Sequence, residues 1–63
     1  MDGRTTIDQA AEEFVDEYGE EAVGVLRARA EAAADLGDAV AAETWHKAAD
    51  AAERKLREAA SPK

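Results

Sequence analysis

The chain has 63 residues with no cysteine, one proline and a formal net charge of −7, from 15 Asp and Glu against eight Lys and Arg. Such a length fits one small domain, since either half alone would be too short to bury a core. This composition excludes a disulfide framework and a thiolate metal site, and the acidic balance argues against binding DNA or RNA through phosphates.

Composition predicts an all-α fold. The chain holds 17 alanines but only eight β-branched residues; alanine is the best helix former, and strands favour β-branched side chains. We expect a single domain over residues 1–63 with three helices at about 6–18, 20–36 and 38–60 and flexible ends at 1–5 and 61–63. The later two helices are expected to form an antiparallel hairpin preceded by the short N-terminal helix.

The first predicted helix, 6–18, separates an apolar face that contains Ile7, Phe14 and Tyr18 from an acidic face. Gly19 then stands where a left-handed C-terminal residue is expected. The alternative is one continuous helix from 6 to 36, because apolar residues keep a three- and four-residue spacing across Gly19. We prefer a break, because Tyr18-Gly19 is typical of a cap and the continuous stripe would contain Arg29.

The second predicted helix, 20–36, has an inner face formed by Ala22, Val25, Leu26, Ala30, Ala33 and Leu36. Arg29 falls on this apolar side. Its stem either lies over the core with the guanidinium in solvent, or it pairs with a carboxylate across an interface. Gly24 lies toward the opposite side, where it costs about 1 kcal/mol relative to alanine if exposed.

Gly37-Asp38 is the clearest boundary in the chain: Gly37 is expected to end one helix and Asp38 to cap the next. So short a connection makes the flanking helices antiparallel. The third predicted helix, 38–60, has an inner arc formed by Ala41, Trp45, Ala49, Ala52, Leu56 and Ala59.

Few bulky side chains are available for a core, so a three-helix monomer is marginal. We therefore expect a homodimer in which paired hairpins form a helical bundle; the alternative is a monomer that relies on helix propensity. The predicted interface and core residues are the larger apolar residues and facing alanines: Phe14, Tyr18, Val25, Leu26, Leu36, Trp45, Ala49, Ala52 and Leu56.

The net negative charge is confined to the first part of the chain. Residues 1–26 hold eight acids and one base, whereas residues 27–63 hold seven of each. The simplest interpretation is a solvated face; the alternatives are a docking face for a basic protein partner and a mimic of nucleic-acid phosphates. Its candidate residues are Glu12, Glu13, Asp16, Glu17 and Glu20. The segment Arg54-Lys55-Leu56-Arg57 supplies basic side chains that neutralise part of this negative charge within the chain.

Signals of catalysis are weak. Glu43 and His46 form a Glu-x-x-His pattern, which faces a di-metal site in some four-helix proteins, so a metal-binding or ferroxidase-like bundle is an alternative. A helical wheel places Glu43 on the outer side, and Ser61, the serine of any triad, lies at the predicted frayed end. We expect that the protein is not an enzyme and that it binds no cofactor. With apolar runs of four residues at most and no signal-peptide pattern at the start, we also expect no membrane association and a cytoplasmic location.

Two resemblances support a helical hairpin. Within Ala32 to Ala52, the spacing of Gly37, Ala42 and Ala49 is similar to a tetratricopeptide-repeat hairpin, although His46 replaces the usual aromatic and no second copy follows. The chain also resembles short uncharacterised helical-hairpin proteins of alphaproteobacteria. The residues that carry this likeness are Tyr18-Gly19-Glu20-Glu21-Ala22, Arg29-Ala30, Leu36-Gly37-Asp38, Ala42, Trp45 and Leu56. It implies a bacterial cytoplasmic origin and no activity, which leaves a protein-interaction or regulatory module as the expected function.

Overall fold

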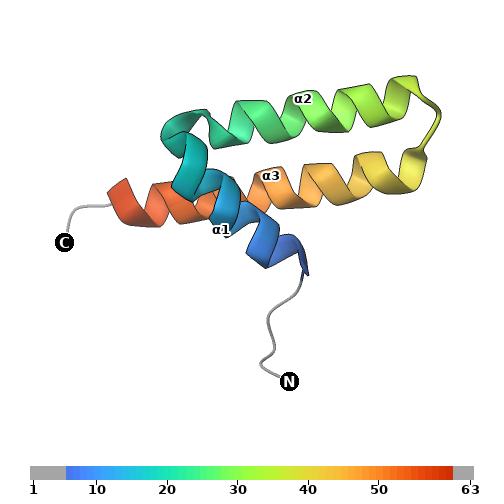
Figure 1. Cartoon of the computed structure of the whole chain (residues 1–63). Helices are drawn as coiled ribbons and strands as arrows, with labels where there is room; N and C mark the ends of the chain where they lie inside the picture. The colour runs from blue at the N-terminus through green and yellow to red at the C-terminus, as the bar shows by residue number, and fades with distance from the viewer. Residues whose placement is uncertain (1–5, 61–63) are drawn as a thin grey trace.

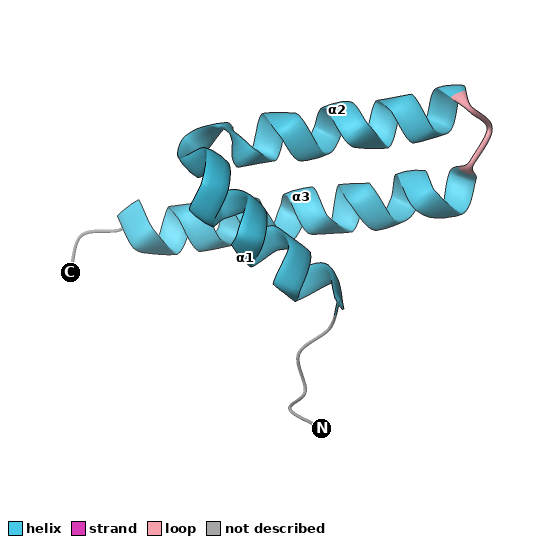
Figure 2. Ribbon diagram, in the orientation of Figure 1, coloured by secondary structure: helices cyan, strands magenta, loops and turns pink. Residues whose placement is uncertain are grey.

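The structure, a computed structural model, describes residues 6–60 and is helical almost throughout (Figures 1 and 2). Its elements are α1 (Thr6–Tyr18), the 3-10 turn η1 (Gly19–Glu21), α2 (Ala22–Asp35) and α3 (Ala39–Ala60). The described residues contain no strand, so the all-α prediction is confirmed. The ends predicted to be flexible, 1–5 and 61–63, lie outside the described residues.

An antiparallel hairpin of α2 and α3 forms the body of the fold, and α1 crosses it at an angle (Figure 1). Helix α1 packs more extensively against α3 than against α2. The predicted hairpin is therefore confirmed, and one end of it is covered by α1 while the end that carries the α2–α3 turn extends beyond α1.

Around Gly19 the chain changes direction without leaving helical structure. No loop residue separates α1 from α2, so the helical run extends from residue 6 to 35. Within it, α-helical geometry gives way to one 3-10 turn at η1, where Gly19 has a φ of +61°. The predicted left-handed glycine is present, but neither a simple break nor one regular helix describes this junction. A positive φ suits glycine because it has no Cβ.

The α2–α3 turn is closed by hydrogen bonds on both sides. Gly37, at a φ of +81°, donates its N–H to the Ala34 carbonyl at 2.9 Å. Asp38 donates its own N–H to the Ala33 carbonyl at 2.9 Å, which completes a Schellman motif. The Asp38 carboxylate then accepts the Ala41 N–H at 3.0 Å. Both predicted signals, a stop at Gly37 and a cap at Asp38, are confirmed.

Alanine dominates the core. The buried residues are Ala11, Ala22, Leu26, Ala30, Ala42, Ala48, Ala49, Ala51 and Ala52. Leu26 is the one large side chain that is fully buried among the residues described. Larger residues such as Phe14, Val23 and Trp45 pack around this cluster while remaining partly exposed. The helices are therefore held together by small side chains, which let their axes approach closely.

The predicted interface and core residues differ in how deeply they are buried. Leu26, Ala49 and Ala52 are buried, and Phe14, Val25, Trp45 and Leu56 are half-buried. Tyr18 and Leu36 are not buried within the single chain, where they are 39% and 86% exposed, so their predicted place at an interface stays a prediction. Tyr18 still contacts the Phe14 ring, with centroids 5.5 Å apart, whereas Leu36 follows the end of α2 at the tip of the hairpin.

The buried surface of α3 is wider than a single stripe. Ala42, Ala48 and Ala51 are buried although the predicted arc omitted them, and Ala59 is exposed although the arc included it. The wider burial arises because α3 packs against α2 on one side and against α1 on another, whereas Ala59 lies in the last turn of α3, where the residues are exposed. A helix with two neighbours buries two adjacent stripes.

We predict opposite effects for two glycine-to-alanine changes. Gly37→Ala should lower the free energy of unfolding by about 1–2 kcal/mol, because an L-residue is strained at a φ of +81°. Gly24→Ala should raise it by up to about 1 kcal/mol, because Gly24 is helical and exposed and an added Cβ meets nothing within 4 Å. Urea unfolding followed by circular dichroism measures both changes; a loss of stability in Gly24→Ala would contradict this account.

Candidate interaction surfaces

An open groove of about 780 Å³ runs between α2 and α3 in the half of the hairpin that carries the turn. It is lined mainly by small and apolar residues: Val25, Ala28, Arg29, Ala32, Ala33, Leu36, Asp38, Ala41 and Trp45. Helix α1 meets the hairpin at the inner end of this groove, where Phe14 contacts Trp45. The groove is thus the part of the apolar hairpin face that lies beyond α1.

Arg29 occupies the inner end of the groove on two aromatic rings. Its guanidinium carbon lies 5.6 Å from the Phe14 centroid and 5.7 Å from the Trp45 centroid. The two rings meet edge-on, with centroids 6.1 Å apart and planes at 76°. A cation above a ring face is attracted by the π electrons. Arg29 makes no ion pair with any residue that the structure describes.

Sequence reasoning missed this stacking. It placed Arg29 on the apolar side of its helix, with the guanidinium either in solvent or on a carboxylate, and did not consider the rings. A usable signal was available, because Phe14 and Trp45 were both assigned to inner faces that meet the same side of α2. A lone arginine on an apolar stripe opposite two aromatics is a candidate for a cation–π contact.

The outer end of the groove lies at the hairpin turn and is apolar and exposed. Leu36 lines it at 86% exposure, and the neighbouring Val40 is 76% exposed. Asp38 also lines the groove and brings a carboxylate to this end. The groove therefore has a positive group at its inner end and a negative group at its outer end. The predicted interface role of Leu36 stays a prediction.

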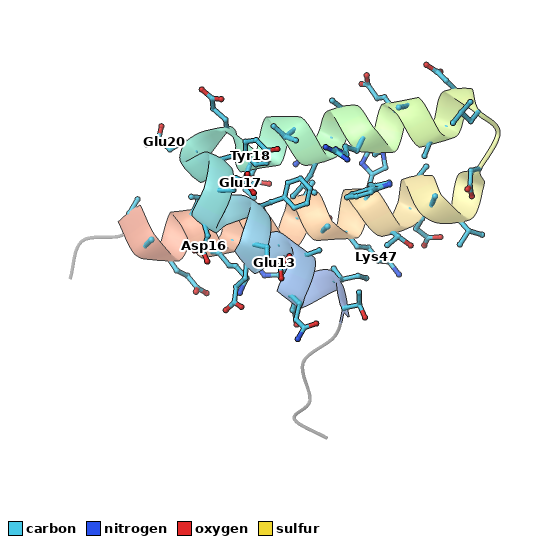
Figure 3. All side chains as sticks on the ribbon, viewed as in Figure 1. Glu13, Asp16, Glu17, Tyr18, Glu20 and Lys47 are labelled. Carbon is cyan, nitrogen blue, oxygen red and sulfur yellow. The ribbon has the colours of Figure 1, made fainter. Side chains whose placement is uncertain are left out.

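The acidic face is a second surface, on α1 and the turn after it. Glu12 forms an ion pair with Lys55 at 4.0 Å, which links α1 to α3. That pair confirms that the basic segment 54–57 answers part of the acidity. The exposed carboxylates of Glu13, Asp16, Glu17 and Glu20 make no ion pair within residues 6–60 (Figure 3). Glu13, Asp16 and Glu17 share one side of α1 by their helical spacing, and Glu20 follows in η1.

A network of ion pairs joins the two hairpin helices away from the groove lining. Arg27 of α2 reaches Glu53 of α3 at 3.2 Å and Asp50 at 3.8 Å, and Glu53 also accepts a hydrogen bond from Arg57 at 3.3 Å. All of these side chains are substantially exposed, so each pair contributes less than about 1 kcal/mol. None of the four residues lines the groove.

Glu43 and His46, the candidate metal-binding pair, are both exposed on α3. The Glu43 carboxylate lies 3.7 Å from the Lys47 ammonium, a pairing that the sequence analysis did not consider (Lys47 is labelled in Figure 3). Within the described part of the chain, no three His, Cys, Asp or Glu side chains come together as metal ligands would. No helix of residues 6–60 combines the length and the apolarity needed to cross a bilayer.

Comparison with protein-family models, with curated proteins and with solved structures gave no match to this chain. The resemblance to alphaproteobacterial hairpin proteins therefore stays a prediction, and function is inferred from the two surfaces.

We predict that the stacked arginine stabilises the fold. Arg29→Ala should lower the free energy of unfolding by about 1 kcal/mol, because the guanidinium loses both ring contacts. Arg54→Ala is a matched control: this arginine is exposed and makes no ion pair within residues 6–60, so we expect a change within about 0.5 kcal/mol. Unfolding followed by Trp45 fluorescence measures both. Equal effects of the two changes would mean that the ring contacts contribute nothing.

Proposed function

We propose that the chain is a non-catalytic interaction module that pairs with a second copy of itself through the groove between α2 and α3. The observation that carries this proposal is the uncovered apolar lining of the groove near the hairpin turn, where Leu36 is 86% exposed next to the alanines of the groove walls. Apolar residues that gather on one side of a small protein mark interaction sites more often than apolar residues scattered singly.

The thin core supports the same proposal. With Leu26 as the one large side chain fully buried in the described residues, the single chain gains little from burial of bulky groups. Burying Leu36 from two copies would contribute roughly 3–6 kcal/mol at about 1.5–3 kcal/mol for each side chain, and burial of the groove alanines adds to this. Association itself costs about 4–15 kcal/mol. These terms are of the same size, so we expect a reversible dimer rather than a permanent one.

Charge does not oppose pairing at this end of the molecule. Residues 27–63 hold seven acids and seven bases, so the net charge of −7 comes from residues 1–26. Two hairpins can meet through their turn-bearing halves while the acidic faces on α1 remain apart. Alanines on the groove walls favour such a contact, because they let helices approach closely and lose no side-chain entropy on burial.

We predict that the melting temperature rises with protein concentration between about 1 µM and 1 mM, because dimerisation stabilises the folded state by mass action. The variant Leu36→Ser should lose most of this dependence. Its stability at the lowest concentration should stay within about 0.5 kcal/mol of the parent, because the Leu36 side chain is exposed in the single chain. Light scattering gives the mass across the same series. A monomeric mass throughout, with a constant melting temperature, would overturn the proposal.

The acidic face supports a second candidate function, docking of a basic protein partner. Glu13, Asp16, Glu17 and Glu20 make no ion pair within residues 6–60, so their charge is available to a partner. A surface of one sign mainly accelerates association and selects partners of the opposite sign. This function is compatible with pairing through the groove, because the two surfaces share no residue.

We predict that a decalysine peptide binds the chain and that neutralising the four carboxylates with Gln or Asn weakens binding by about tenfold at low salt. A matched control neutralises four exposed acids of the hairpin: Glu31, Asp35, Glu43 and Glu58. This set removes the same total charge. Fluorescence anisotropy of the labelled peptide compares the two sets. If both sets weaken binding equally, the peptide senses net charge alone and the acidic face is not a docking site.

A further inference from the structure

The two charged residues of the groove lie at opposite ends of it. Arg29 stands seven residues before Leu36 along α2 and its cap, and Asp38 stands seven residues before Trp45 along α3. Arg29 and Leu36 are therefore about 10 Å apart along one wall of the groove, and Asp38 and Trp45 about 10 Å apart along the other, at 1.5 Å of helix rise per residue. The cation marks the inner end of the groove, and the carboxylate marks the outer end, beside the turn.

From this arrangement we infer that the occupant of the groove is a second copy lying antiparallel to the first, with Arg29 of each chain beside Asp38 of the partner. The inference rests on the proposed dimer and specifies its orientation. A twofold axis across the middle of the groove exchanges its two ends, so each cation meets a carboxylate. In an interface of this kind the same patch serves on both subunits.

Other occupants would match only one of the two charges in the groove. An acidic segment would meet Arg29 favourably but face Asp38, and a basic segment would do the reverse. Arg29 is already held on two rings and makes no ion pair within residues 6–60, so its guanidinium is positioned to receive a carboxylate. A second copy supplies both opposite charges at the correct ends, together with the apolar side chains that cover Leu36 and the alanines.

A parallel arrangement of two copies is disfavoured by charge at two places. It would set Arg29 against the same residue of the partner, and likewise Asp38, and like charges in contact disfavour that orientation. It would also bring the two α1 helices to the same end of the dimer, although residues 1–26 carry the entire net charge of −7. The antiparallel arrangement places the two acidic faces at opposite ends.

A mixing experiment tests the orientation. Arg29→Glu and Asp38→Arg should each weaken self-association roughly tenfold, because two attractive pairs become two repulsive ones. An equimolar mixture of the two variants should form heterodimers with the parent's affinity, because in an antiparallel pair both contacts again join opposite charges. Native mass spectrometry separates the heterodimer from the homodimers by mass. A statistical distribution of the three species would overturn the inference. So would homodimers of the variants as tight as the parent together with a heterodimer tighter than the parent, because in a parallel dimer the parent's like charges already face each other and only the heterodimer joins opposite charges.

A second pair of variants leaves both charges in place and decides the question if the charge variants unfold. The chain has no cysteine of its own. Ala32→Cys puts a thiol on the groove lining near its middle, whereas Ala34→Cys puts one on an exposed site outside it. Near a twofold axis the first variant should form an intermolecular disulfide several times faster than the second. Equal rates would contradict pairing through this groove.

The failures of the two proposals are distinguishable. A parent chain that stays monomeric to about 1 mM overturns the dimer and its orientation together. A parent chain that dimerises overturns the orientation alone if the mixture shows no heterodimer preference, or if each single variant self-associates as tightly as the parent. Asp38→Asn serves as a control for folding, because asparagine is as good a helix N-cap as aspartate and removes the charge; it should weaken association only two- to threefold.

Discussion

The close approach that alanine permits is the constraint on which the structure depends. Each methyl group removes little apolar area from water, so the core gains its stability from many small contacts between helices rather than from a few bulky ones. Among the described residues, Leu26 alone combines a large side chain with complete burial. Because the core is a thin layer, it cannot close over a hairpin of this length without a further helix on top.

Helix α1 covers only part of the hairpin, so the molecule has a packed half under α1 and an open half beyond it. Under α1, α3 buries alanines toward two neighbours, and Glu12 reaches Lys55 across the contact. Beyond α1, hydrogen bonds take over from packing: the Schellman motif at Gly37 and the cap at Asp38 satisfy backbone groups at both helix ends. The turn is therefore held locally, and the exposure of Leu36 next to it does not loosen it.

Local signals in the sequence predicted the parts of the fold that depend on neighbours along the chain. The helical class, the hairpin, the left-handed Gly19 and the stop and cap at Gly37 and Asp38 each follow from a few adjacent residues. The path of α1, the double burial of α3 and the stacking of Arg29 depend on residues distant in sequence. A helical wheel of one helix cannot show these features, because it has no information on how many neighbours that helix meets.

The exposure of Leu36 shows why periodicity alone predicts an apolar face but not what covers it. The apolar stripe of α2 continues past Arg29 to the end of the helix, and nothing in its spacing changes where the cover by α1 ends. Where the buried face of a helix is covered along only part of its length, the uncovered turns usually carry polar residues on that face. Here the pattern instead keeps Ala32, Ala33 and Leu36 on the groove, so the uncovered half retains the sequence of a buried one. The same stripe thus encodes a core in its first half and, by the proposal above, an interface in its second, because burial inside one chain and burial between two chains require the same residues.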